Sequence, residues 1–139
     1  MKIICIGRNY ADHAKEMKSA VPTEPLYFLK PDTAILREGD FYYPNFTKDL
    51  HFECELIVKI DRVGKHIDKS FAHKYYSEFS LGIDFTARDI QEHCKANGLP
   101  WEKAKGFDSS AAISNQWINK ADLDLETAEF TFFQNDELK

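Results

Sequence analysis

The chain has 139 residues, a length that suits one domain with a core of its own. Hydrophobic residues make up 43% and aromatic residues 14% of the sequence, and no apolar run is long enough to cross a bilayer, so we expect a folded globular domain. The net charge is −5, from 18 basic and 23 acidic residues without a basic block, which argues against nucleic acid as a partner.

The predicted elements of the first half are mostly short strands. Residues 2–6 are rich in β-branched residues and predict a buried strand that ends at Gly7. A short helix is predicted over 10–18. Further strands are predicted over 32–36, 41–43 and 52–60, the last ending in a Leu-Ile-Val-Lys-Ile run typical of a central strand.

The second half continues this alternation. Residues 70–76 predict one or two helical turns, 79–85 a strand, and 86–97 a helix closed by Gly98. Near the end, a strand over 128–134 is followed by an Asn-Asp turn signal and the start of a return strand over 137–139. From the sequence we therefore expect the chain to stop inside a hairpin.

The order of these elements predicts the fold class. Strands outnumber helices and do not alternate with them in strict βαβ order, which favours an α+β fold over a doubly wound parallel sheet. No internal repeat, low-complexity tract or Gly/Ser linker interrupts the sequence. We predict a single domain over residues 1–139.

Cysteine usage and the N-terminus indicate a compartment. Cys5, Cys54 and Cys94 are widely spaced, with no CxxC pair, which indicates neither a disulfide framework nor a thiolate zinc site and is typical of a reducing environment. The first residues are strand-like and do not form a signal peptide. We predict a cytoplasmic protein that does not bind membranes.

Three acids suggest metal chemistry. Glu53 and Glu55 stand two apart on a predicted strand and so point the same way, and with Asp84 they can form an oxygen cage for a hard divalent cation. An isolated Glu-x-Glu pair is more often the solvated face of a strand. Three carboxylates without a soft ligand favour Mg²⁺ or Mn²⁺, with Ca²⁺ as an alternative. Cys54 alternates to the opposite face.

A histidine and a glutamate suggest a base. His13 and Glu16 lie three apart on the predicted first helix, within reach of each other. A carboxylate beside an imidazole orients it and raises its basicity, so the pair could take a proton from water. An ordinary surface pair is the alternative for such a spacing.

Several cationic and amide side chains could bind a carboxylate substrate. These candidates are Arg8, Lys30, Arg88, Gln91 and Lys105, each within a distinctive segment, and Lys105 is also a candidate catalytic residue. Surface salt bridges are the alternative for each cation. Gly7 follows a strand, but the glycine spacing of a dinucleotide site is missing, so we predict no nucleotide cofactor.

Five segments occur in one order: Ile6 to Glu16, Phe28-Leu-Lys-Pro31, the Glu53/Glu55 pair, Gly82 to Gln91, and Gly98 to Asp108. In this combination the sequence resembles the fumarylacetoacetate hydrolase family, most closely its acylpyruvase and oxaloacetate decarboxylase branch. The resemblance implies a roll of mixed β-sheets with a few peripheral helices, assembled as a homodimer. It also implies that Glu53, Glu55 and Asp84 bind the metal and that His13 and Glu16 activate a water molecule.

The leading hypothesis is an enzyme that uses Mg²⁺ or Mn²⁺ to hydrolyse a C–C bond in acylpyruvate-type β-diketo acids, with a small 2-oxo acid as substrate. The alternative is an oxaloacetate decarboxylase or a related 2-oxo acid isomerase or lyase. A third hypothesis is an inactive metal-binding fragment, because members of the family that the chain resembles continue with a further strand-rich third.

Overall fold

The structure is a computed structural model and describes residues 1–10 and 22–139. Their contacts divide the chain into two compact units. The first unit comprises Met1–Glu53 and Asp84–Ala112, and the second comprises Cys54–Ile83 and Ile113–Lys139. Each unit is therefore built from two separate stretches of sequence. The prediction of a single domain stays a prediction.

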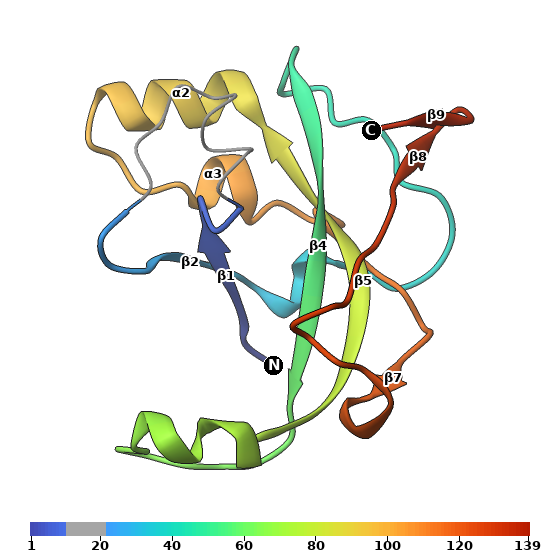
Figure 1. The fold of residues 1–139 in the computed structure, drawn as a ribbon. Helices are drawn as coiled ribbons and strands as arrows, with labels where there is room; N and C mark the ends of the chain where they lie inside the picture. The colour runs from blue at the N-terminus through green and yellow to red at the C-terminus, as the bar shows by residue number, and fades with distance from the viewer. Residues whose placement is uncertain (11–21) are drawn as a thin grey trace. The chain divides into compact units, whose positions relative to one another are not determined.

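The first unit begins with a pair of antiparallel strands (Figure 1). Strand β1, Ile3–Gly7, pairs with β2, Leu26–Lys30, in a register that sets Ile3 opposite Lys30 and Gly7 opposite Leu26. The structure thus confirms a strand at the N-terminus. Strand β2 was not predicted, and the predicted helix over 10–18 lies mostly outside the described residues.

A mixed sheet contains the longest strands. Its strand order is β3-β6-β5-β4, from Ile35–Leu36, Ala111–Ile113, Tyr76–Ala87 and Leu50–Ile60, and β7, Ile118–Asn119, also pairs with β5. Strands β3 and β6 run parallel, whereas β5 and β7 run antiparallel. The predicted strands over 52–60 and 79–85 are confirmed within β4 and β5.

Two helices in the first unit follow the sheet strands. Helix α2, Arg88–Ala96, ends where Gly98 adopts a left-handed φ of 62°, and the N–H of Leu99 donates to the carbonyl of Cys94 at 2.9 Å. This is the Schellman arrangement that glycine favours at a helix C-terminus, as the sequence predicts. The short helix α3, Glu102–Lys105, follows and ends at Gly106.

The remaining elements are short. The 3-10 helices are η1, Asp32–Ala34, η2, Lys69–Lys74, and η3, Lys120–Asp122. The last strands, β8 and β9, cover Phe133–Gln134 and Glu137–Leu138. The two turn residues between them, Asn135 and Asp136, have φ of 51° and 65°, so the predicted hairpin turn is confirmed.

The predicted strand over 41–43 is wrong. Residues 40–44 form no regular element. The ring of Phe41 stacks on that of Phe85, with centroids 3.8 Å apart, and the hydroxyl of Tyr43 accepts a hydrogen bond from the backbone N–H of Leu50 at 2.9 Å. These side-chain contacts replace the ladder of a strand, because they fix the segment without a partner strand.

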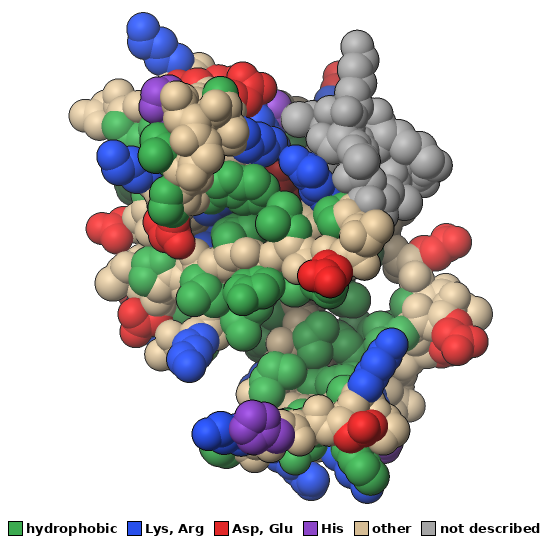
Figure 2. Space-filling view, turned by 90° about the vertical axis from the view of Figure 1, so that its left-hand side faces the viewer, with side chains coloured by type: hydrophobic (Ala, Val, Ile, Leu, Met, Phe, Trp, Pro, Cys, Tyr) green, Lys and Arg blue, Asp and Glu red, His purple; other side chains and the backbone are tan. Residues whose placement is uncertain are grey.

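Hydrophobic side chains gather on the face shown in Figure 2. In the β1–β2 pair, the register joins Ile4 to Leu29 and Ile6 to Tyr27, and all four side chains are exposed. One face of this pair is therefore an apolar surface. None of the helices within residues 1–10 and 22–139 combines the length and apolar character of a membrane span.

The interior of the first unit is unusually polar. Eight of its described polar or charged residues are buried: Lys30, Thr47, Asp84, Thr86, Arg88, Gln91, Lys105 and Ser110. Buried charges are rare unless they are paired, so such a group needs a chemical explanation. Mixed sheets with few helices match the predicted α+β class, and the polar interior locates the candidate site.

Candidate active site

Glu53 lies on β4, where both of its carboxylate oxygens are bound by cations. Arg88 Nη2 donates to Oε1, and Lys105 Nζ donates to Oε2 at 2.7 Å. Burial alone would raise the pKa of Glu53, but the charges and hydrogen bonds of Lys105 and then Arg88 outweigh it and lower the pKa to about 2. Glu53 is therefore an anion at any physiological pH.

Asp84 lies on β5 and is only 7% exposed. Its Oδ2 accepts a hydrogen bond from Lys105 Nζ at 2.7 Å. Its Oδ1 lies 2.7 Å from Lys30 Nζ, close enough for an ion pair, yet it has no partner in hydrogen-bond geometry among the described residues. Asp84 is thus neutralised by two lysines and keeps one oxygen with unused acceptor capacity.

Lys30 ends β2 and is 2% exposed. Its ammonium donates to the carbonyl and hydroxyl oxygens of Ser110 at 2.8 and 3.0 Å, approaches the carbonyl of Phe85 at 3.3 Å, and pairs with Asp84. Burial lowers the pKa of Lys30, while the charge of Asp84 opposes this shift. An ammonium has three protons, so internal partners suffice to occupy all of them.

Lys105 closes helix α3 and is likewise 2% exposed. Its three donors go to Glu53 Oε2, Asp84 Oδ2 and Thr86 Oγ1, at 2.7, 2.7 and 2.5 Å. The ring centroid of Phe28 lies 5.0 Å from the ammonium. Lys105 therefore joins two of the three acids that the sequence singles out, Glu53 and Asp84.

Arg88 is the first residue of α2, and its backbone N–H donates to the carbonyl of Asp49 at 2.8 Å. Its guanidinium donates from Nη1 to Gln91 Oε1 at 2.5 Å, from Nη2 to Glu53, and from Nε to His51 Nδ1 at 3.4 Å. Lys30, Glu53, Asp84, Arg88 and Lys105 form what we call the cation–carboxylate cluster.

Three residues around this cluster were not singled out by the sequence analysis: His51, Thr86 and Ser110. His51 accepts from Arg88, and its Nε2 lies 3.1 Å from Asp49 Oδ1, so the neutral ring carries its proton on Nε2. Thr86 lies two residues after Asp84 on β5 and therefore shares a face of the strand with it. This spacing could have identified Thr86 from the sequence. Ser110 carries no such signal.

The remaining predicted residues lie as follows. Glu55 is half-buried two residues farther along β4, in the second unit. Arg8 is half-buried and has a left-handed φ of 57°. Its positive charge acts on Lys95, whose pKa is lowered by burial and then by the charges of Arg88 and Arg8. His13 and Glu16 lie outside the described residues.

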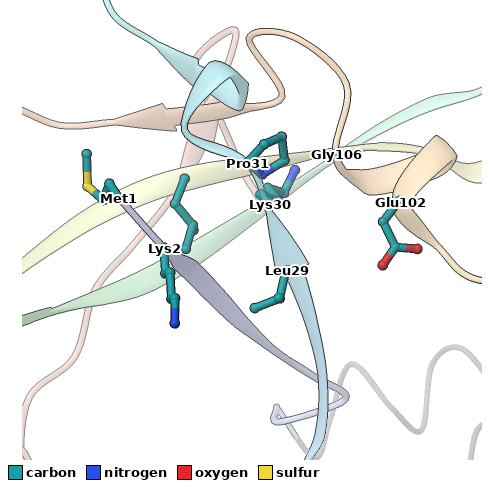
Figure 3. Close-up of a pocket in the computed structure, with 8 residues that line it drawn as sticks. Met1, Lys2, Leu29, Lys30, Pro31, Glu102 and Gly106 are labelled. Carbon is teal, nitrogen blue, oxygen red and sulfur yellow. The ribbon is translucent and has the colours of Figure 1, made fainter. Parts of the chain in front are cut away.

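A cavity of about 450 Å³ borders the cluster on the side of Lys30. Figure 3 shows Lys30 and Pro31 beside Gly106, with Leu29, Glu102 and the N-terminal residues around them. A Cβ added at Gly106 would lie 3.1 Å from the Glu102 carbonyl oxygen and 3.3 Å from Pro31 Cδ. The glycine therefore allows the segment that carries Lys105 to approach the end of β2.

Glu53 and Asp84 are the members of the cluster that could contribute oxygen ligands to a hard divalent cation. In the part of the chain that the structure describes, no three His, Cys, Asp or Glu side chains are grouped as a metal site. However, Glu53 Oε2 and Asp84 Oδ2 both lie 2.7 Å from one ammonium, and Asp84 Oδ1 has spare acceptor capacity. Carboxylate oxygens that converge on one positive charge are the ligands that Mg²⁺ and Mn²⁺ prefer.

Known proteins are similar to this chain in sequence. The chain is 46% identical over 113 residues to a mitochondrial oxaloacetate tautomerase of Bos taurus and 43% identical over 115 residues to a mitochondrial oxaloacetate decarboxylase of Dictyostelium discoideum. Each alignment covers 81% of this chain, and 51% and 53% of the respective relatives, so the chain spans about half of their length. The cytoplasmic location stays a prediction from the sequence.

Solved structures share the fold. One described as a fumarylacetoacetate hydrolase family protein of Yersinia pestis superposes with a TM-score of 0.90 at 36% identity, covering 99% of this chain and 64% of that chain. A fumarylpyruvate hydrolase of Pseudomonas aeruginosa in complex with Mn²⁺ and pyruvate superposes with a TM-score of 0.75 at 36% identity, covering 81% and 51%.

A family model matches nearly the whole chain. The model described as fumarylacetoacetate (FAA) hydrolase C-terminal aligns with residues 2–139, which include every member of the cation–carboxylate cluster. The match agrees with the order of motifs in the sequence and with the mixed sheets of the structure. The chain therefore belongs to the fumarylacetoacetate hydrolase family.

Proposed function

We propose that this chain provides the site of a divalent-metal-dependent reaction on a small 2-oxo acid, with oxaloacetate as the first candidate substrate. Similarity to oxaloacetate tautomerases at up to 49% identity and to an oxaloacetate decarboxylase at 43% supports this substrate. Tautomerisation moves a proton between C3 and the C2 oxygen, and decarboxylation leaves an enolate at the same atoms. A site that stabilises negative charge on the C2 oxygen can therefore serve either reaction.

The observation that carries the proposal is the bonding of Arg88. Within the described residues, its guanidinium uses three of its five N–H groups, one from each nitrogen, on Gln91, Glu53 and His51. One N–H on each terminal nitrogen is left, and a guanidinium can bind a carboxylate through two hydrogen bonds. Because Gln91 Oε1 accepts a hydrogen bond from Arg88, the amide nitrogen of Gln91 is the atom that can donate to the substrate.

The metal would be held by Glu53 and Asp84, with Glu55 as the predicted third ligand. When bound, Mg²⁺ or Mn²⁺, or Ca²⁺ as the alternative, would polarise the 2-oxo group as a Lewis acid. Lys105, which contacts both acids, is the proposed donor to the C2 oxygen as negative charge develops there. Lys30 would hold Asp84 in place, and Arg88 would orient the substrate carboxylate.

Hydrolysis of acylpyruvate-type β-diketo acids is the second candidate. The similarity to the fumarylpyruvate hydrolase of Pseudomonas aeruginosa favours it. This reaction adds water to the distal carbonyl, so it needs a base, and His13 with Glu16 is the proposed pair. Assembly as a homodimer, without a nucleotide cofactor, nucleic acid or membrane as partner, completes the proposal.

The test measures three reactions of the intact protein with Mg²⁺ and with Mn²⁺: enol–keto conversion of oxaloacetate, its decarboxylation, and cleavage of an acylpyruvate. We expect at least one reaction of oxaloacetate to depend on the metal, and Arg88→Met to lower its kcat/KM by about a hundredfold or more. Arg37→Met, a change at an exposed arginine, is the matched control.

His13→Ala separates the two candidates. A loss of acylpyruvate cleavage with retained turnover of oxaloacetate would assign both activities to one metal site with a dedicated base. Absence of any metal-dependent turnover of either substrate class would refute the proposed function.

A further inference from the structure

The two lysines of the cation–carboxylate cluster have different kinds of partner. Two of the three closest oxygens around Lys30 Nζ belong to Ser110, an uncharged residue. Two of the three acceptors of Lys105 are carboxylates, on Glu53 and Asp84. Lys30 is thus held mainly by the fold, whereas Lys105 is held mainly by the acids that the proposed metal would use.

A divalent cation and the Lys105 ammonium would compete for these oxygens. Mg²⁺ binds carboxylate oxygens at about 2.0–2.1 Å, and a lysine ammonium at hydrogen-bond distance from the same two oxygens would lie beside it. Two like charges at such a short distance repel strongly in a buried site. The Lys105 ammonium, in its present position, therefore opposes the binding of a divalent cation by Glu53 Oε2 and Asp84 Oδ2.

The lysine side chain can move away without losing every favourable contact. Its ammonium sits on a flexible four-carbon stem. The Phe28 ring centroid is 5.0 Å from Nζ. An aromatic face attracts a cation, so this contact does not depend on the two carboxylates.

We propose that Lys105 is an exchangeable counter-ion. Without the metal, its ammonium holds Glu53 and Asp84 together and neutralises them. When a divalent cation binds these carboxylates, Lys105 releases them, and its N–H groups become available to the substrate. This inference rests on the proposed function, because it assumes that Glu53 and Asp84 are metal ligands.

The first test is calorimetric titration of the intact protein with Mn²⁺. Lys105→Met removes the competing ammonium and should tighten Mn²⁺ binding about tenfold or more. A tenfold change corresponds to about 1.4 kcal/mol, which is within the range of a hydrogen bond to a charged group. Lys30→Met removes the same charge near Asp84 and is the matched control. It should not tighten binding to a similar extent, because Ser110 holds Lys30 in place.

A neutral variant separates exchange from simple charge repulsion. Thr86→Val removes only the uncharged acceptor of Lys105 and should tighten Mn²⁺ binding by a few-fold, because it weakens the position that the lysine must leave. An affinity for Mn²⁺ that is unchanged or weaker in Lys105→Met, or equal gains in Lys105→Met and Lys30→Met, would overturn the exchange.

A measurement on the wild type does not depend on the variants folding. Acylation of lysine amines, located by peptide mass spectrometry, should increase at Lys105 when Mn²⁺ is added and stay unchanged at Lys30. Equal protection of Lys105 with and without Mn²⁺ would also overturn the exchange. If instead Mn²⁺ binds Glu53→Gln as tightly as the wild type, or does not bind the wild type, the metal site itself fails and the proposed function with it.

Discussion

The ammonium of Lys30 lies 2.7 Å from Oδ1 of Asp84, and both side chains are at least nine-tenths buried. Lys30→Met should therefore destabilise the protein by about 3 kcal/mol or more, because it leaves a buried carboxylate with one cation fewer and removes one donor from each of two oxygens of Ser110. Urea denaturation measures this loss.

Lys59→Met is the control, since Lys59 pairs with Glu78 through side chains that are 48% and 31% exposed. An exposed pair contributes about 0–1 kcal/mol. Equal losses in the two variants would contradict the structural importance of Lys30.

Glu53 makes the stability of the protein depend on pH. Its pKa is about 2 in the folded chain against an ordinary value of 4.5, so the ionised form is stabilised by folding. This contribution is fully present above pH 4.5 and is lost as the pH falls through about 2. The difference of 2.5 units corresponds to roughly 3 kcal/mol at most.

Glu53→Gln removes this dependence. The difference in unfolding free energy between wild type and variant, measured in urea at pH 7 and at pH 3, should shrink on acidification. Glu137→Gln, at a carboxylate whose side chain is 74% exposed, provides the comparison. A difference that stays constant between the two pH values would show that Glu53 is not held as the structure indicates.

Arg88→Lys tests geometry rather than charge. Lysine keeps the positive charge but cannot bridge Glu53, Gln91 and His51 at once, because it lacks the planar fork of N–H groups. We expect kcat/KM for the 2-oxo acid to fall about tenfold to a hundredfold, and the unfolding free energy to fall by about 1–3 kcal/mol.

Arg37→Lys, the same change at an exposed arginine, should leave both quantities unaltered. Wild-type kcat/KM in Arg88→Lys would mean that positive charge alone suffices at this position.

Gly106→Ala should disturb the end of helix α3. The added Cβ would lie 3.1 Å from the carbonyl oxygen of Glu102 and 3.3 Å from Pro31 Cδ, and neither neighbour is a flexible side-chain tip. Overpacking of this kind costs about 1–3 kcal/mol. Thermal unfolding should show a lower Tm.

Gly7→Ala is the matched control, because its nearest contacts would be at an ordinary 3.6 Å. A loss confined to Gly106→Ala would confirm that the approach of Pro31 requires glycine there, whereas similar effects of both changes would not.

The sequence predicted the charged members of the site because they lie in distinctive motifs. Glu53, Asp84, Arg88 and Lys105 are named by those motifs, and the structure brings all four together. Nothing in the sequence indicates which cation binds which acid, because these pairs join residues at least 21 positions apart. The role of Lys105 as a link between two acids could therefore be seen only in three dimensions.

The fold shows the same division between local and distant effects. The end of α2 was predictable because Gly98 alone determines a left-handed turn there. Strand β2 was not, because its apolar run lacks a strand-like alternation and its identity as a strand depends on pairing with β1. Residues 41–43 have strand-forming side chains, yet contacts of Phe41 and Tyr43 within the first unit determine their conformation.

Ser110 connects both lysines of the cluster. Its hydroxyl accepts from Lys30 Nζ and donates to the backbone carbonyl of Lys105 at 2.8 Å, while its own carbonyl accepts from Lys30 and from the N–H of Phe85. A small neutral residue thereby sets the spacing between two charged side chains that would act on the substrate. Substitution of Ser110 would consequently change the relative position of Lys30 and Lys105 without removing a charge from the cluster.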